Sequence, residues 1–284
     1  MLTELPEADA TGEIAEIFAE IRQLYATPYV SSIHRHLATR PGVLEWAWKS
    51  VAPVFRSGQA QDLAWAAARR ESLAPLTPIP REVLAYWGIG AVEIAQIKGV
   101  AQSFTRVAPV NMVFGGLIAD VLLAGTELAG GVAAGEAGAD AVGREGAWMP
   151  PALLPSPPAM VDAAELANPE RDVLQLFRSG TGETAFVPGL YRMLAHWPGL
   201  LAHLAVELGQ KFNSSEKSAA AERLLAGTRI IVAEVAPQVA WSDGGPASNG
   251  PEAAHLRRMI AGYRVTSPEM ILFGRLVEDA LPPG

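Results

Sequence analysis

The sequence predicts an all-α protein made of two homologous helical bundles, and three observations support this. Apolar residues recur every three to four positions, alternating β-branched stretches are nearly absent, and one half of the chain repeats the other. Pro41-Gly42 is answered by Pro198-Gly199 at an offset of 198 − 41 = 157, and segment 109–115 by 268–274 at 268 − 109 = 159. Copies of about 130 residues exceed the roughly 20–50-residue periods of solenoids. We therefore expect two halves that pack face to face as an internal pseudo-dimer.

Proline and glycine positions divide the first half into helices. Thr11 is a plausible N-cap of the first helix, which ends before Pro28 because the residue preceding a proline is disfavoured in the α conformation. Pro109 is expected to open a new helix. The helices predicted in this half cover residues 11–26, 30–39, 43–55, 59–72, 81–87, 91–108 and 110–128.

The composition changes to glycine, alanine and proline between Gly125 and Pro158, which is typical of a linker. We predict an N-terminal repeat over 1–128, a linker over 129–160 and a C-terminal repeat over 161–284. Helices in the second repeat are expected at 162–179, 187–196, 199–213, 216–235, 250–265 and 268–281, with an insertion at 241–251.

Composition narrows the classes of function. The 284 residues are 50% hydrophobic, enough for a sizeable core, and the net charge of −8 argues against nucleic acid or an anionic membrane as partner. The absence of cysteine excludes thiol nucleophiles, disulfides and Cys-ligated zinc. The first residues lack the pattern of a secretory signal, and the apolar runs are too short or too charged for a membrane span. We expect a soluble cytoplasmic protein.

Several stretches together resemble the group I (DL-2-)haloacid dehalogenases, an all-helical family built as an internal pseudo-dimer. They cover residues 12–22, 27–30, 37–48, 195–198 and 263–264. The resemblance implies a hydrolase that acts on carbon–halide bonds without metal or other cofactor. A carboxylate would activate a water that displaces halide from C2 of a small 2-haloacid. The partner would be a small carboxylic acid in a cleft between the halves, and the sequence leaves a homodimer open.

The resemblance also carries a site onto this chain. The family's catalytic aspartate falls on Leu190, which cannot take a proton. Glu183 is the nearest upstream acid and therefore the candidate for a substitute base. Residues expected to line the substrate pocket are Tyr29, Ser32, Asn111, Phe114, Gly189, Tyr263, Ser267 and Met270.

Some candidate residues also have structural interpretations. Asn111 follows Pro109 near an expected helix start, where an asparagine can act as a cap. Tyr29 and Tyr263 would ordinarily be core or groove aromatics. Glu269 follows Pro268 at an expected helix start, where the helix dipole favours a carboxylate.

The histidines favour structural roles. His34, Arg35 and His36 form a basic cluster that we expect on a solvated surface. His34 and His36 are two residues apart on a helix, face different ways and are poorly placed to share a metal. His196 is expected to make a turn contact before Trp197.

Three hypotheses of function follow: a dehalogenase-like hydrolase, a non-catalytic descendant that binds a small carboxylate or apolar ligand, and a helical scaffold without a ligand. Leu190 favours the second over the first, whereas Tyr29, Asn111 and Tyr263 disfavour the third. A Ser-His-acid triad lacks its strand–turn–helix context, and the glycine-rich stretches match neither phosphate-binding pattern.

Overall fold

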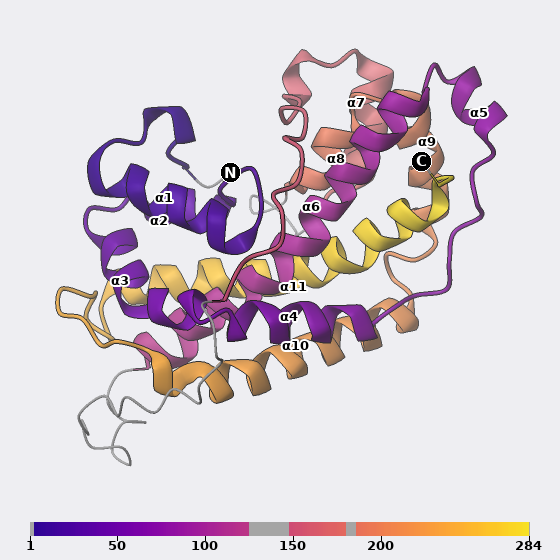
Figure 1. Ribbon diagram of the computed structural model, residues 1–284. Coiled ribbons are helices and arrows are strands. Elements are labelled where there is room, and N and C mark those ends of the chain that lie inside the picture. Colours follow the sequence, from indigo (N-terminus) through magenta and orange to yellow (C-terminus); the bar gives the residue numbers. More distant parts are fainter. Residues whose placement is uncertain (1–2, 125–147, 180–185, 284) are drawn as a thin grey trace.

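The computed structural model describes residues 3–124, 148–179 and 186–283. These residues form α-helices with short 3₁₀ and π segments, and within them the only β pairing is an isolated bridge between Ser179 and Phe186. The all-α fold class predicted from the sequence is confirmed. Figure 1 shows the long helices α6 and α11 crossing in the middle of the molecule.

In the part of the chain that the structure describes, the first half contains six α-helices and the second half contains five. The first half contains α1 (Gly12–Tyr25), α2 (Ser32–Leu37), α3 (Val43–Arg56), α4 (Gln59–Arg70), α5 (Arg81–Tyr86) and α6 (Ala91–Gly116), which continues as a π-helix over Leu117–Leu122. The second half contains α7 (Asn168–Gln175), α8 (Gly189–Leu194), α9 (Pro198–Gly209), α10 (Ser215–Val235) and α11 (Pro251–Ala280). Both α2 and α8 span six residues and precede a longer helix.

Two predicted helix breaks are wrong. Pro109 lies inside α6 and Pro268 lies inside α11, and each helix runs through its proline without interruption. An internal proline removes one backbone hydrogen bond and costs about 3 kcal/mol. Residues 107–116 and 266–274 are buried throughout, so tertiary packing outweighs this local cost.

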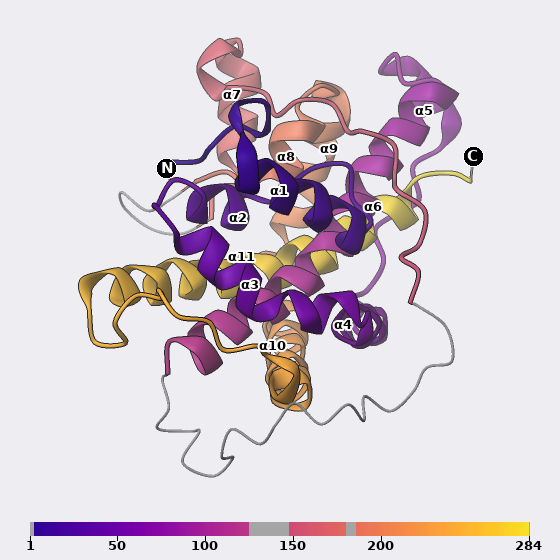
Figure 2. The same cartoon turned by 60° about the vertical axis from the view of Figure 1, so that its left-hand side comes forward.

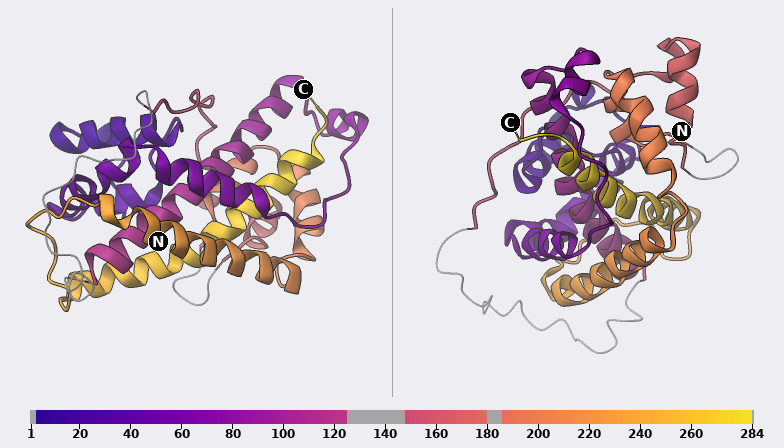
Figure 3. Two further views of the ribbon diagram at one scale, coloured as in Figure 1. Left: turned by 60° about the horizontal axis from the view of Figure 1, so that its bottom comes forward. Right: turned by 90° about the vertical axis from the view of Figure 1, so that its right-hand side faces the viewer.

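The hydrophobic core consists of two clusters, and each takes residues from both halves. The first joins α1, α2 and α3 to the C-terminal part of α6, the end of α10 and the start of α11. The second joins α8 and α9 to the N-terminal parts of α6 and α10 and to the end of α11. The helices α4 and α10 pack side by side against α6 (Figures 1 and 2). The long helices therefore connect the two clusters (Figure 3).

Close contacts at two glycines define how α6 crosses α11. A Cβ on Gly115 would lie 3.2 Å from Cγ2 of Ile260, and a Cβ on Gly274 would lie 3.2 Å from the carbonyl oxygen of Ala101. The helices therefore run antiparallel. The offset between equivalent residues is 274 − 115 = 159 and 260 − 101 = 159, the value found in the sequence repeat. A pseudo-two-fold relation of the complete halves stays a prediction.

Helix α6 and its continuation, Ala91–Leu122, are long and apolar enough by composition to cross a membrane. However, 72% of the most apolar window is buried inside the protein. This degree of burial is what the core helix of a soluble protein shows.

Candidate functional site

Two predicted pocket residues from opposite halves meet directly. The side chains of Ser32, at the start of α2, and Tyr263, in α11, lie close enough to interact, and the Ser32 hydroxyl lowers the pKa of the Tyr263 phenol. Burial raises the pKa of the Tyr263 phenol well above its ordinary value, and the charge of Glu4 raises it further. Tyr263 is therefore a neutral hydroxyl at physiological pH, able to donate or accept a hydrogen bond.

Tyr29 and Gly189 both lie near the aromatic ring of Phe104. The rings of Tyr29 and Phe104 are 6.4 Å apart, and a Cβ on Gly189 would lie 3.2 Å from Cζ of Phe104. The same Cβ would lie 3.0 Å from Cε of Met160, so a larger residue at 189 would need these side chains to shift. Phe104 and Met160 were not among the predicted site residues, yet Phe104 of α6 lies near both Tyr29 and the start of α8.

Asn111 lies inside α6 and not at a helix start, so the capping interpretation is wrong. The residue is buried, and its Oδ1 has no hydrogen-bond partner among the described residues. An unpaired buried amide oxygen costs free energy that a bound donor would recover. The phenol oxygen of Tyr29 is in the same state, buried and unpaired.

Phe114 belongs to an aromatic cluster in the first half. Its ring is 4.3 Å from that of His34 and 6.3 Å from that of Phe55. Burial lowers the pKa of His34 to about 3, so its imidazole is neutral at physiological pH. The second half contains a cluster at matching repeat positions, made by Tyr191, Phe212 and Phe273.

The prediction of a solvated surface for the histidines of α2 is wrong. His34 and His36 are both buried. The Nε2 atom of His36 is 2.9 Å from Nε2 of His255 on α11, and its Nδ1 donates to the carbonyl of Thr3 at 2.7 Å. The segment before α1 and the start of α11 cover faces of α2 that its sequence suggested were open. The side chain of His196 makes a long-range contact and not a turn contact, since its Nε2 donates to the carbonyl of Ala159 at 2.9 Å.

Comparison with known proteins bears on this arrangement. No protein-family model matches the chain. Over 103 residues it is 31% identical to a configuration-inverting 2-haloacid dehalogenase of Alcaligenes xylosoxydans xylosoxydans, a match covering 36% of this chain and 34% of that protein. The chain thus matches about a third of this curated relative.

Similarity to solved structures extends over nearly the complete chain. A D-2-haloacid dehalogenase mutant superposes with a TM-score of 0.67 at 18% identity, covering 98% of this chain and 94% of the other. A complex of D-2-haloacid dehalogenase with L-LA gives 0.63 at 19% identity, covering 99% and 95%. The chain has the fold of the D-2-haloacid dehalogenases. The resemblance expected from the sequence is confirmed.

On this dehalogenase fold, the position expected for the catalytic aspartate lies in the core. Leu190 is fully buried in the second hydrophobic cluster. Ser267 and Met270 of α11 are also buried, and Met270 belongs to the same cluster. Glu183, the candidate for a substitute base, lies outside the described residues.

A carboxylate that the sequence suggested was a helix-start residue lies next to this position. Glu269 is in the interior of α11, so the helix-dipole interpretation is wrong. It accepts a hydrogen bond from Tyr191 at 3.2 Å and lies 3.6 Å from Nζ of Lys217. Burial raises the pKa of Glu269, and Lys217 partly opposes this effect. The sequence offered one signal for this position. Pro109 and Pro268 are equivalent in the repeat, so the residues that follow them, Glu269 included, are expected in similar environments.

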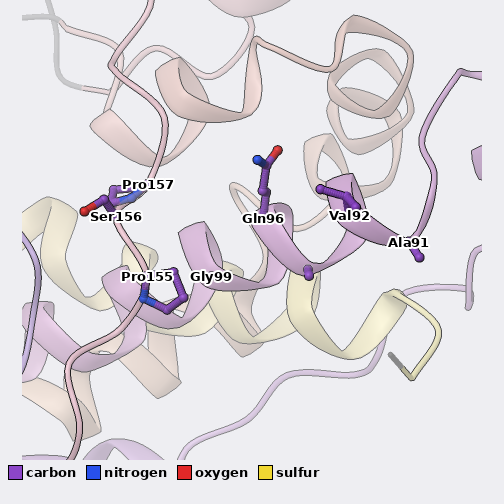
Figure 4. A pocket seen from close by; sticks show the side chains of 8 residues that line it. Ala91, Val92, Gln96, Gly99, Pro155, Ser156 and Pro157 are labelled. Atoms are coloured by element: carbon purple, nitrogen blue, oxygen red, sulfur yellow. The ribbon is translucent and has the colours of Figure 1, made fainter.

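Two surface pockets lie elsewhere on the dehalogenase fold. One, of about 410 Å³, lies between the first turns of α6 and segment 155–157 (Figure 4). The other, of about 540 Å³, lies between α1 and α3. Neither contains a predicted pocket residue. In the part of the chain that the structure describes, no three His, Asp or Glu side chains are grouped to hold a metal ion.

Proposed function

We propose that this protein is a dehalogenase-like hydrolase that takes a small (2-halo)carboxylic acid where α2, α6, α8 and α11 meet. The proximity of Ser32 and Tyr263 carries the proposal, because it joins two predicted pocket positions from opposite halves. The unpaired oxygens of Tyr29 and Asn111 give the region buried polar atoms for a ligand. We place the protein in the cytoplasm, without a cofactor, and leave its oligomeric state to measurement.

The reaction requires a base near C2 of the acid. The base would remove a proton from water, the oxygen would form a bond to C2, and the carbon–halogen bond would break with release of halide. General-base assistance contributes about 10²–10⁴-fold. Leu190 cannot supply it, so the wild-type protein is expected to release little or no halide.

A second candidate function is ligand binding without turnover. The complete burial of Leu190 among apolar side chains favours it, since a leucine offers neither a base nor a hydrogen-bond partner for a water. In this case the protein binds a small carboxylate or apolar ligand as a catalytically divergent homologue.

Halide release from both enantiomers of 2-chloropropionate tests the two candidates. Leu190→Asp should raise the rate of halide release by about 10²-fold or more. Leu190→Asn should not, because asparagine has the size of aspartate but cannot act as a base. Wild-type turnover that is lost in Glu183→Gln or Glu269→Gln would show that the base has moved. Absence of halide release from Leu190→Asp, with 2-chloropropionate bound, would establish the divergent binder.

A further inference from the structure

Arg35 of α2 is partly buried near two residues of the predicted site, although its sequence context suggested a solvated surface. Its charge acts on the phenols of both Tyr29 and Tyr263. Burial raises the pKa of Tyr29, and Arg35 opposes that increase. These effects require the guanidinium to be near both hydroxyls, which come from opposite halves of the chain.

The guanidinium has unused hydrogen-bonding capacity. Its Nε is buried and has no partner among the described residues. A guanidinium has five N–H donors in a fixed fork that matches a carboxylate. The oxygens of Tyr29 and Ser31 are also buried and unpaired. A cation and hydroxyls with free positions form the kind of environment that holds a small organic anion.

One carboxylate already occupies part of this environment. An Nη atom of Arg35 lies 2.6 Å from a carboxylate oxygen of Glu4, and the pair is only 21% and 26% exposed. The segment that carries Glu4 is fixed to α2 on both sides, by Leu5 N–H to the carbonyl of Arg35 at 3.0 Å and by His36 to the carbonyl of Thr3 at 2.7 Å. Glu4 also raises the pKa of Tyr263, so its charge lies near that phenol.

We propose that Arg35 holds the carboxylate of the small acid, and that the side chain of Glu4 is an internal competitor that occupies this position in the unliganded protein. The proposal rests on the proposed function for its ligand class and adds the binding cation and its regulation. When the carboxylate of the ligand replaces that of Glu4 beside Arg35, the charge next to the guanidinium does not change. An overall charge of −8 is therefore no obstacle to binding an anion at this point.

Calorimetric titration of the full chain with 2-chloropropionate, and with propionate as a halogen-free probe, tests this proposal. Glu4→Gln removes the competitor and should tighten binding roughly two- to fivefold, the range expected for a partly exposed ion pair. Arg35→Gln should weaken binding by about tenfold or more, and Arg35→Lys should fall between it and wild type, since a lysine keeps the charge and loses the fork.

A second ion pair supplies matched controls. Arg223 and Glu71 are 2.8 Å apart and link α10 to the residue after α4. Arg223→Gln and Glu71→Gln should leave both affinities unchanged. Circular dichroism at the titration temperature identifies any variant that fails to fold, and Glu4→Gln gives an independent result if Arg35→Gln is unfolded.

The outcomes separate this proposal from the proposed function. Unchanged or weaker binding by Glu4→Gln would contradict the role of Glu4 as a competitor. Full affinity in folded Arg35→Gln would contradict the role of Arg35 in holding the carboxylate. If binding depends on Arg35 but Leu190→Asp releases no halide, the hydrolase proposal is wrong and the binding role of Arg35 stands. If halide is released with a KM that does not change in Arg35→Gln, the hydrolase proposal stands and the binding role of Arg35 is wrong.

Discussion

The carboxylate of Glu269 accepts a hydrogen bond from the phenol of Tyr191 at 3.2 Å, with both groups buried. Burial raises the pKa of Glu269 above its ordinary value of 4.5. The folded protein therefore retains this proton at pH values where the unfolded chain has lost it. The contribution of Glu269 to stability is present at low pH and is lost as pH rises from 4.5 through its folded pKa.

Glu269→Gln should consequently gain stability relative to wild type as pH rises from 4 to 8. Urea denaturation across this range measures the difference. Glu269→Ala, which leaves the Tyr191 hydroxyl without a partner, should lose about 1–3 kcal/mol. Parallel pH curves for wild type and Glu269→Gln would contradict the raised pKa.

His34 should make the protein less stable in mild acid. Its folded pKa is about 3 because of burial, against an ordinary value of 6.5. Below pH 6.5 the unfolded chain binds a proton that the folded protein does not, so stability falls as pH decreases. The expected loss is about 2 kcal/mol between pH 7 and pH 5.

His34→Phe keeps an aromatic ring beside Phe114 and removes the titration. The free energy of unfolding of this variant should depend less on pH than that of wild type, by about 2 kcal/mol over the same interval. Chemical denaturation at pH 7, 6 and 5 measures it. An equal slope in both proteins would show that His34 is protonated in the folded state.

The crossing of α6 and α11 should be sensitive to a single methyl group. A Cβ at Gly274 would lie 3.0 Å from Cγ2 of Thr105 and 3.2 Å from the Ala101 carbonyl oxygen, and backbone cannot move aside. Gly274→Ala is expected to cost about 1–3 kcal/mol. At Gly115 the nearest atom is Cγ2 of Ile260, at 3.2 Å, so Gly115→Ala should cost less.

Gly262 on the same helix supplies the control. It is exposed, and no atom lies within 4 Å of a Cβ built there. Gly262→Ala should stabilise the protein by up to about 1 kcal/mol through helix propensity. Thermal or urea unfolding ranks the three variants. Destabilisation by Gly262→Ala equal to that of Gly274→Ala would refute the role of the crossing.

Removal of the Tyr263 hydroxyl should weaken both folding and ligand binding. Tyr263→Phe removes the interaction with the Ser32 hydroxyl and costs about 1 kcal/mol of stability. In calorimetric titration with 2-chloropropionate, affinity should fall by about fivefold or more, from a lost hydrogen bond worth about 1 kcal/mol. Tyr86→Phe, which changes a phenol that is 88% exposed on α5, should alter neither quantity.

Local sequence signals predicted the helices well wherever a local rule decides the structure. Thr11 precedes α1, and the Pro41-Gly42 turn ends before α3. The same rules failed at Pro109 and Pro268, where helix–helix packing overrides the local preference against proline. They also failed at His34, because helical spacing indicates that two residues face different ways but not which faces other elements cover.

The site could be predicted only in part for the same reason. The family resemblance places Ser32 and Tyr263 in one pocket, and the two side chains do lie close together, whereas the pocket itself stays a prediction. Arg35, Phe104 and Glu269 depend on which segments cover α2, α6 and α11. The alignment of His34 with Tyr191 in the repeat was a usable signal, since two aromatic rings at equivalent positions are expected in equivalent cores.

The passage of α6 and α11 through both hydrophobic clusters has a consequence for how the chain folds. Neither cluster can be completed by residues of one half, so a fragment of residues 1–128 or 161–284 would expose the apolar faces of its own long helix. Denaturation of the full chain should then be a single cooperative transition, and the separate fragments should acquire stable structure only when mixed. Halves that share their cores in this way depend on one another as the subunits of an obligate dimer do.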